Sequence, residues 1–190
     1  MHSLVCRGEY CSFFIDSCLK MSGLTELFVS LPQIYNKKSM SYNLLKGKRG
    51  IVFGALNEQS IAWKVAEKAV EEGAVITLSN TPVAVRMGEV SALAEKLNCE
   101  VIPADATSVE DLENVFKRSM EVLGGKIDFV LHSIGMSPNV RKKRTYDDLD
   151  YDMLNKTLDI SALSFHKMIQ SAKKLNAINE YGSIVALSYV

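Results

Sequence analysis

The residues best suited to chemistry lie in one short stretch, which reads Arg-Gly-Ile-Val-Phe-Gly-Ala-Leu-Asn-Glu-Gln-Ser-Ile-Ala from Arg49 to Ala62. A β-branched and aromatic run ends at Gly54, a polar loop follows, and apolar positions at helical spacing begin after Ser60. A bound pyrophosphate needs a tight turn, free N–H groups and the positive end of a helix. The stretch therefore predicts the strand, turn and helix that open a dinucleotide-binding fold, although the G-x-G-x-x-G spacing is absent.

Two positions near this stretch bear on which nucleotide would bind. The Ser60 hydroxyl can cap the helix and also bond a phosphate oxygen, with a plain N-cap as the alternative. The next predicted strand is followed by Ser79-Asn80-Thr81, where a carboxylate that binds the ribose 2′-OH is usual. Without that acid a 2′-phosphate is not repelled, so the choice between NADH and NADPH stays open.

Two further groups follow later strands. Asp105 can accept from an adenine amino group while the N–H of Ala106 donates to the ring, or Asp105 can serve as a turn carboxylate ahead of the helix at Ser108. Ser133-Ile134-Gly135 follows the fourth predicted strand, where backbone can approach the ribose of a nicotinamide. Gly135 permits that approach, and a simple strand-ending glycine would look the same.

The elements that must position these groups alternate along the chain. Apolar runs predict strands at 51–53, 74–78, 100–103, 127–132 and 182–189, and helical periodicity predicts helices at 60–72, 83–97, 108–123 and 151–175, with a polar, basic loop at 133–150. Ser108 and Asp111 fit a capping box. The alternation predicts an α/β fold, a Rossmann-like doubly wound parallel sheet of strand order 3-2-1-4-5. Its cofactor crevice should lie at the carboxyl ends of the first and fourth strands.

Composition limits the other classes of function. The 190 residues contain 22 Lys and Arg against 22 Asp and Glu, so bulk charge gives no reason to expect nucleic acid or an anionic membrane as a partner. No apolar run approaches the length of a membrane span. The four cysteines have poor metal spacing, and we expect reduced thiols in a cytoplasmic protein without a metal site.

The two ends of the chain differ from its middle. Residues 1–39 have no clear period and are expected to be an extension outside the fold, with a degenerate targeting segment as the alternative. Residues 40–190 are expected to form the NAD(P)-binding domain. The chain stops at Val190, directly after Tyr189 at the end of a predicted buried strand, which predicts a fragment incomplete at its C-terminus.

These residues together resemble a known family. The sequence resembles the bacterial enoyl-acyl-carrier-protein reductases, a divergent branch of the short-chain dehydrogenase/reductase superfamily, in order and spacing from Met40 to Val190. The matching motifs are Gly54 through Ser60-Ile61-Ala62, Asp105, His132-Ser133-Ile134-Gly135 and Leu187-Ser188-Tyr189.

The resemblance implies NADH-dependent reduction, with NADPH possible, of a trans-2-enoyl thioester on acyl carrier protein in fatty acid elongation. The positions that match cofactor contacts are Gly54, Ser60, Ile61, Asp105, Ala106 and Ile134. Ser137 matches a position near the substrate, and Tyr189 matches the first of two active-site tyrosines, whose hydroxyl would serve as an oxyanion donor. The family's second tyrosine and its lysine lie beyond Val190, so this chain is expected to be inactive by itself. The family also implies a homotetramer for the full-length form.

Alternatives remain open at this point. Ser188 suits a carbonyl reductase or alcohol dehydrogenase of the same superfamily. The alternative outside the enzymes is a non-catalytic nucleotide-binding module. Arg141-Lys142-Lys143-Arg144 is either a solvated loop or a docking site for an acidic carrier protein. His132 is expected to be a structural residue at a strand end rather than a catalyst.

Overall fold

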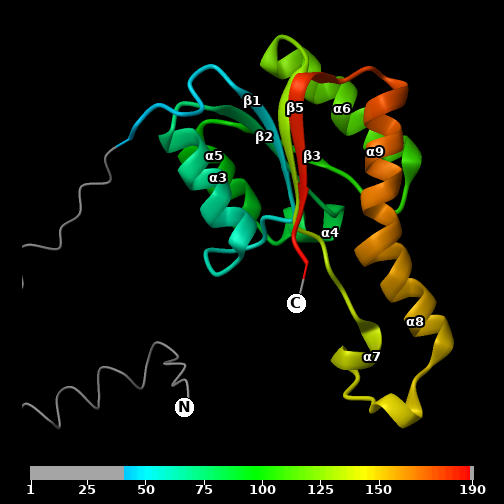
Figure 1. The fold of residues 1–190 in the computed structure, drawn as a ribbon. Coiled ribbons are helices and arrows are strands. Elements are labelled where there is room, and N and C mark those ends of the chain that lie inside the picture. The colour runs from blue at the N-terminus through cyan, green and yellow to red at the C-terminus, as the bar shows by residue number, and fades with distance from the viewer. Residues whose placement is uncertain (1–40, 189–190) are drawn as a thin grey trace, which may run out of the picture. The chain divides into compact units, whose positions relative to one another are not determined.

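The computed structural model describes residues 41–188, and these form a parallel sheet of five strands with helices on both faces (Figure 1). The strand order is β3-β2-β1-β4-β5, which confirms the predicted topology. The strands are β1 (Arg49–Phe53), β2 (Val75–Asn80), β3 (Glu100–Pro103), β4 (Ile127–His132) and β5 (Ile178–Ala186). The helices are α3 (Ile61–Glu71), α4 (Pro82–Arg86), α5 (Glu89–Leu97), α6 (Val109–Leu123), α7 (Pro138–Arg141), α8 (Tyr151–Leu158) and α9 (Ser164–Lys174).

Alternating side chains of β1 build a core on each face of the sheet. Ile51 and Phe53 face a cluster that includes Phe116 of α6 and Met168 of α9. Val52, between them, faces the cluster formed with α3 and α5. Figure 1 shows the sheet nearly edge-on, with α6 and α9 on one side of it and α3 and α5 on the other. A strand buried on both faces explains the uninterrupted apolar run that predicted it.

The predicted strands and helices need four corrections. β2 continues through Ser79 and Asn80, which were predicted to break it. The helix predicted at 83–97 is two helices, because Gly88 has a φ of +90° and interrupts the helical backbone. The loop at 133–150 contains α7 and a 3₁₀ turn at Tyr146–Asp148. β5 begins at Ile178, not Gly182, and reaches regular pairing with β4 only at Ser183, after an irregular stretch.

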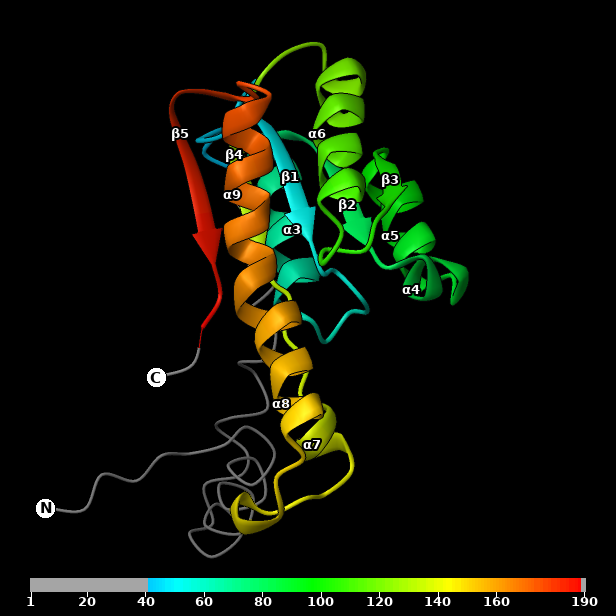
Figure 2. The same ribbon diagram turned by 90° about the vertical axis from the view of Figure 1, so that its right-hand side faces the viewer.

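The helix predicted at 151–175 is continuous but changes type in its middle. α8 passes into a π turn, Asp159–Leu163, and then into α9. Figure 2 shows α8 and α9 as one rod whose α8 end extends past the carboxyl ends of the strands. The predictions for residues 1–39 fall outside the described part of the chain.

Candidate dinucleotide-binding site

Gly54 forms the turn at the carboxyl end of β1, and no other residue fits there. Its φ is +87°, and a Cβ built on it would lie 2.0 Å from the Ser133 carbonyl oxygen. The Gly54 N–H donates to the Ser79 carbonyl at 3.0 Å, and the Ser133 N–H donates to the Phe53 carbonyl at 3.2 Å. The ends of β1, β2 and β4 therefore meet at one glycine, and a side chain would push them apart.

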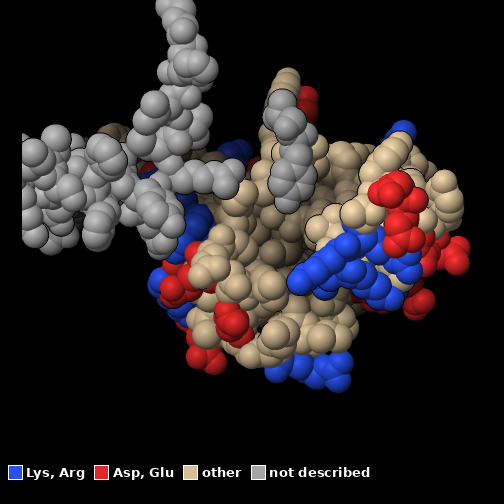
Figure 3. Space-filling model, turned by 90° about the horizontal axis from the view of Figure 1, so that it is seen from below, with Lys and Arg blue, Asp and Glu red and all other residues tan. Residues whose placement is uncertain are grey.

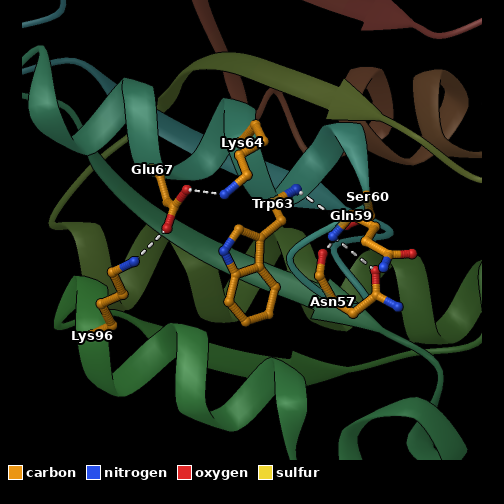
Figure 4. Close-up of polar contacts among 7 residues, drawn as sticks. All are labelled: Asn57, Gln59, Ser60, Trp63, Lys64, Glu67 and Lys96. Atoms are coloured by element: carbon orange, nitrogen blue, oxygen red, sulfur yellow. Dashed lines mark hydrogen bonds and ion pairs between the residues drawn. The ribbon is translucent and has the colours of Figure 1, made fainter. Parts of the chain in front are cut away.

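Ser60 is the N-cap of α3, and its hydroxyl is fully used inside the loop. The Oγ donates to the Asn57 carbonyl at 2.8 Å and accepts from the N–H groups of Leu56 at 3.2 Å and Trp63 at 3.4 Å (Figure 4). The first N–H groups of the helix, which begin at Ile61, have no partner within the helix. The Ile61 side chain is 63% exposed. The backbone at Ile61 is therefore better placed than the Ser60 hydroxyl to receive an anion.

An ion-pair cluster fixes α3 against α5. Glu67 of α3 pairs with Lys96 of α5 and, at 3.0 Å, with Lys64 (Figure 4). These two lysines, Lys96 first, hold the pKa of Glu67 at about 2, although partial burial opposes them. Trp63, which is 5% exposed and is the chain's single tryptophan, lies beside the cluster in the first turn of α3. It is a natural optical reporter on the Gly54–Ser60 loop.

Asn80 stands at the end of β2, where the acid that binds a ribose would be expected. Its Nδ2 donates to the Ala55 carbonyl at 2.9 Å, and its Oδ1 accepts from the Thr81 N–H at 2.8 Å. The amide thereby ties the Gly54 loop to the start of α4. Both the nitrogen and the oxygen of the Asn80 side-chain amide are therefore used in structural hydrogen bonds.

Asp105 begins the loop after β3 and is held in a tight turn. Its Oδ1 accepts from the Thr107 N–H at 2.9 Å and from the Thr107 hydroxyl at 2.8 Å. The Asp105 N–H donates to Asp111 Oδ2 at 2.8 Å, so the predicted capping box is wrong in one half. Ser108 caps α6 as predicted, but the Asp111 carboxylate bonds the Asp105 backbone instead of that of Ser108. The Asp105 side chain is exposed, and Ala106 beside it is buried.

The segment after β4 carries the other predicted residues. Ile134 is half-buried and packs against the core on the α6 and α9 face. Ser137 is the N-cap of α7 and accepts from the Val140 N–H at 3.4 Å. A Cβ on Gly135 would meet nothing within 4 Å among the described residues. The surroundings of this position therefore do not require a glycine.

His132 is buried at the end of β4, as predicted for a structural residue. Its Nε2 lies 2.8 Å from Ser164 Oγ, which is also 2.6 Å from the Ile160 carbonyl. A carbonyl only accepts, so the single hydroxyl proton goes to Ile160 and His132 Nε2 donates to the serine. Burial lowers the pKa of His132, which favours the neutral ring.

A cleft of about 490 Å³ brings several of these groups together at the carboxyl ends of the strands. Seen from the side of these ends, the molecule is hollowed, with Lys and Arg side chains along one rim (Figure 3). The predicted residues that line the cleft are Gly54, Asp105, Ala106 and Ile134. Ser60, Ile61 and Ser137 are not among the lining residues, and Tyr189 lies outside the described part of the chain.

Several lining residues were not singled out from the sequence. They are Met136, Lys156, Asp159 and Ile160 among others, and the last three come from α8 and the π turn. The only signal for them was the length of the helical stretch at 151–175, which does not tell which turn faces a cleft. Arg141, part of the predicted basic run, also lines the cleft.

A larger hollow, of about 770 Å³, lies at the amino ends of β2 and β3, where Val75 and Glu100 begin those strands. It includes Cys99, and burial raises the pKa of this thiol to about 11, so the thiol remains protonated at neutral pH. Ligands of open parallel sheets bind at the carboxyl ends of strands where the strand order reverses, which is where the smaller cleft lies.

Residues 41–188 carry neither of two features that would indicate another class of protein. In this part of the chain no cluster of three or more His, Cys, Asp and Glu side chains is arranged to hold a metal ion. Its helices are all too short or too polar to cross a membrane.

The sheet order, the glycine turn and the cleft at the switch point define an α/β protein of the dinucleotide-binding class. A family model described as Enoyl-(Acyl carrier protein) reductase matches residues 54–190, and the chain belongs to this family. The prediction made from the Gly54, Asp105 and His132–Gly135 motifs is thereby confirmed.

Individual relatives agree with the family. The chain is 35% identical to the "Enoyl-[acyl-carrier-protein] reductase [NADH] FabI" of Rickettsia bellii, over 79% of this chain and 56% of the relative. A crystal structure of FabI from Alistipes finegoldii is 74% identical with a TM-score of 0.76, over 78% of this chain and 57% of that one. A FabI–NADH complex from the same organism has the same identity and TM-score, over 78% and 52%. The chain thus spans little more than half the length of these relatives.

Proposed function

We propose that the whole protein reduces a trans-2-enoyl thioester, carried on acyl carrier protein, with NADH as the hydride donor. The observation that carries the proposal is the family match over residues 54–190, which includes the glycine turn and the cleft. The relatives in Rickettsia bellii and Rhizobium meliloti are named as NADH-dependent enoyl reductases. The carbonyl reductase that Ser188 suggested has no comparable support.

The residues present fit a dinucleotide. Gly54 leaves its turn bare of side-chain atoms, and the N–H groups at the start of α3, from Ile61 on, suit a pyrophosphate. Asp105 uses Oδ1 within its own turn, and the described residues show no bond to Oδ2, which suits an adenine amino group. Ala106 and Ile134 line the cleft on either side. We assign these five residues to the cofactor, and Ser60 to the cap that holds the loop.

The nicotinamide, when bound, supplies a hydride to the β-carbon of the enoyl thioester. In this proposal Tyr189 donates a hydrogen bond from its hydroxyl to the thioester carbonyl oxygen, where negative charge develops. Ser137, the N-cap of α7, lies close to the substrate in this proposal. The neutral His132, bonded to Ser164 inside the core, takes no proton from the reaction and supports the end of β4.

The partner and assembly proposals rest on surface features. Arg141, Lys142 and Lys143 are exposed beside the cleft, whereas Arg144 pairs with Asp148 at 3.0 Å. This basic loop suits an acidic carrier protein that delivers the substrate. Leu158 and Leu163, on α8 and the π turn, are 50% and 52% exposed, which suits packing against further copies in a homotetramer. We place the protein in the cytoplasm, with the fatty acid elongation it is proposed to serve.

The test uses binding and turnover together. NADH is titrated against the purified chain while Trp63 fluorescence is recorded, and NADPH is titrated in parallel. In the whole protein, NADH consumption is followed with a crotonyl thioester on carrier protein. We expect saturable NADH binding that quenches Trp63, weaker NADPH binding, and NADH consumption that requires the thioester. Binding without any thioester-dependent consumption in the whole protein would favour a non-catalytic nucleotide-binding module and contradict the proposal.

A further inference from the structure

The π turn between α8 and α9 sits against the cleft. Its residues are Asp159–Leu163, and both Asp159 and Ile160 line the cleft. π turns are rare because their hydrogen-bond geometry is poorer than that of an α-helix, and they occur frequently at functional sites. Two side chains of this turn, Ser161 and Asp159, are linked to the walls of the cleft.

Ser161, in the middle of the turn, bonds the backbone of Met136 on both sides. Its Oγ accepts from the Met136 N–H at 3.0 Å and donates to the Met136 carbonyl at 3.2 Å. Met136 lines the cleft directly after Gly135, a residue with open space around it. One hydroxyl thus fixes the two peptide groups that flank Met136, next to a glycine that has no side chain to pack.

Asp159, the first residue of the turn, reaches the opposite wall through a lysine. Lys167 Nζ donates to Asp159 Oδ1 at 2.7 Å and to the Thr107 carbonyl at 3.0 Å. Thr107 closes the turn that holds Asp105. The loop after β3 and the segment after β4 are 29 positions apart at Thr107 and Met136. Both are linked to the same turn, Met136 directly through Ser161 and Thr107 through Lys167.

We propose that the π turn is a positioning element that holds the two walls of the cleft at a fixed spacing. Ser161 is the positioning residue for the Met136 wall, and Lys167 is the positioning residue for the Thr107 wall. The inference rests on the proposed function, because NADH is the ligand that would span both walls. Beyond the residues assigned to the cofactor, the inference gives a role to two side chains, Ser161 and Lys167, that contact the walls and not the ligand.

The experiment compares Ser161→Ala with a matched control. Ser171→Ala removes a buried hydroxyl of α9 that has no hydrogen-bond partner among the described residues. NADH and ADP are titrated against both variants and against Ser161→Thr, which keeps the hydroxyl. We expect Ser161→Ala to weaken NADH about tenfold and ADP less than about twofold, since ADP lacks the nicotinamide half. Ser161→Thr should recover most of the NADH affinity, and Ser171→Ala should bind both ligands as the unsubstituted protein does.

Lys167→Met tests the other wall. It should lower the affinities for ADP and NADH alike, by about threefold to tenfold. The reason is that the Thr107 carbonyl, in the turn that holds Asp105, loses the Lys167 ammonium that donates to it. Lys173→Met, an exposed lysine of the same helix, is the control and should change neither affinity. Equal losses of ADP and NADH in Ser161→Ala, or unchanged ADP binding in Lys167→Met, would overturn the assignment of one residue to each wall.

A measurement without ligand separates this inference from the proposed function. Amide exchange at Met136 should speed up in Ser161→Ala relative to Ser171→Ala, because the N–H loses its acceptor. Unchanged exchange would overturn the positioning role of Ser161 whether or not NADH binds. Failure of the unsubstituted protein to bind NADH, with faster exchange in Ser161→Ala, would contradict the proposed function alone.

Discussion

The two walls of the cleft are built in different ways. The wall formed by the ends of β1 and β3 is held mainly by contacts between near neighbours in sequence, such as Ser60 with Asn57 and Asp105 with Thr107. Lys167 adds one contact from a distant helix, at the Thr107 carbonyl. The wall formed after β4 is held by side chains of a distant helix, with Ser161 bonded to Met136 and Ser164 to His132. The first wall is therefore set mainly by local backbone geometry, and the second depends on where α8 and α9 pack. Gly54 is where the two walls meet.

Replacing Gly54 should have the largest effect, because it breaks the junction between the walls. In Gly54→Val the new Cβ must avoid the Ser133 carbonyl oxygen at 2.0 Å, and a β-branched residue must adopt a φ of +87°. We expect a loss of about 3 kcal/mol or more in the free energy of unfolding, and loss of NADH binding. Chemical denaturation and NADH titration measure the two effects.

Gly135→Ala is the matched control for this substitution. Its Cβ would enter open space, so stability should change by less than about 0.5 kcal/mol. If Gly54→Val lost no more stability than Gly135→Ala, the strand ends would tolerate a Cβ at Gly54. That result would contradict the close approach of the strand ends at Gly54.

The same contrast between local and distant contacts explains how far the sequence predicts this molecule. The glycine turn at Gly54 and the cap at Ser60 follow from residue types within a few positions, and both are confirmed. The strand order follows from the alternation of elements, since right-handed crossovers leave few arrangements. Ser161 carries no such signal, because its partner Met136 is 25 residues away and a helical pattern does not tell which turn becomes π.

The errors arise from local as well as distant contacts. Spacing alone pairs Asp111 with Ser108, but its carboxylate accepts from the Asp105 N–H, six positions away. Ser79 and Asn80 were assigned to a break because of their polarity, but the neighbouring strands β1 and β3 extend the pairing to both. Gly88 is the local signal for the split helix, because its positive φ cannot continue a helix.

The next largest effect should come from acidification, which should lower the free energy of unfolding through His132 in the wall after β4. Burial lowers the pKa of His132 in the folded protein, so the unfolded chain binds a proton first as the pH falls below about 6.5. Stability present above that pH is then lost as the pH falls toward the folded pKa, by at most about 1.4 kcal/mol per pH unit. Urea denaturation between pH 8 and about pH 5 should show this slope, and His132→Gln should reduce it.

His166→Gln provides the comparison for the titration experiment. His166 is exposed on α9, so its replacement should leave the slope close to that of the unsubstituted protein. If His132→Gln kept the full slope, His132 would not be the group that links this wall to pH.

A charge introduced at Ser60 tests whether phosphates approach the first wall. Ser60→Ala should cost about 1 kcal/mol, because α3 loses the acceptor for the Trp63 N–H. Ser60→Asp keeps an acceptor at the N-cap but cannot donate to the Asn57 carbonyl, so its stability should lie between those of Ser60→Ala and the unsubstituted protein. The added carboxylate would nevertheless repel a pyrophosphate at the start of α3, so NADH affinity should fall by about tenfold or more. Unchanged affinity in Ser60→Asp would mean that the phosphates do not approach this helix.

The smallest effect should come from the ion pairs behind the first wall. Glu67→Gln removes the partner of Lys96 and Lys64, which are largely exposed, and should cost no more than about 1 kcal/mol at neutral pH. The pKa of Glu67, about 2, lies below that of an unfolded glutamate, so this contribution is present above about pH 4.3 and is lost as the pH falls toward 2. The difference in unfolding free energy between Glu67→Gln and the unsubstituted protein should therefore shrink on acidification and in high salt. Glu67, Lys64 and Lys96 are not lining residues of the cleft, so NADH affinity should stay unchanged. A parallel loss of affinity would mean that the first wall also depends on these ion pairs.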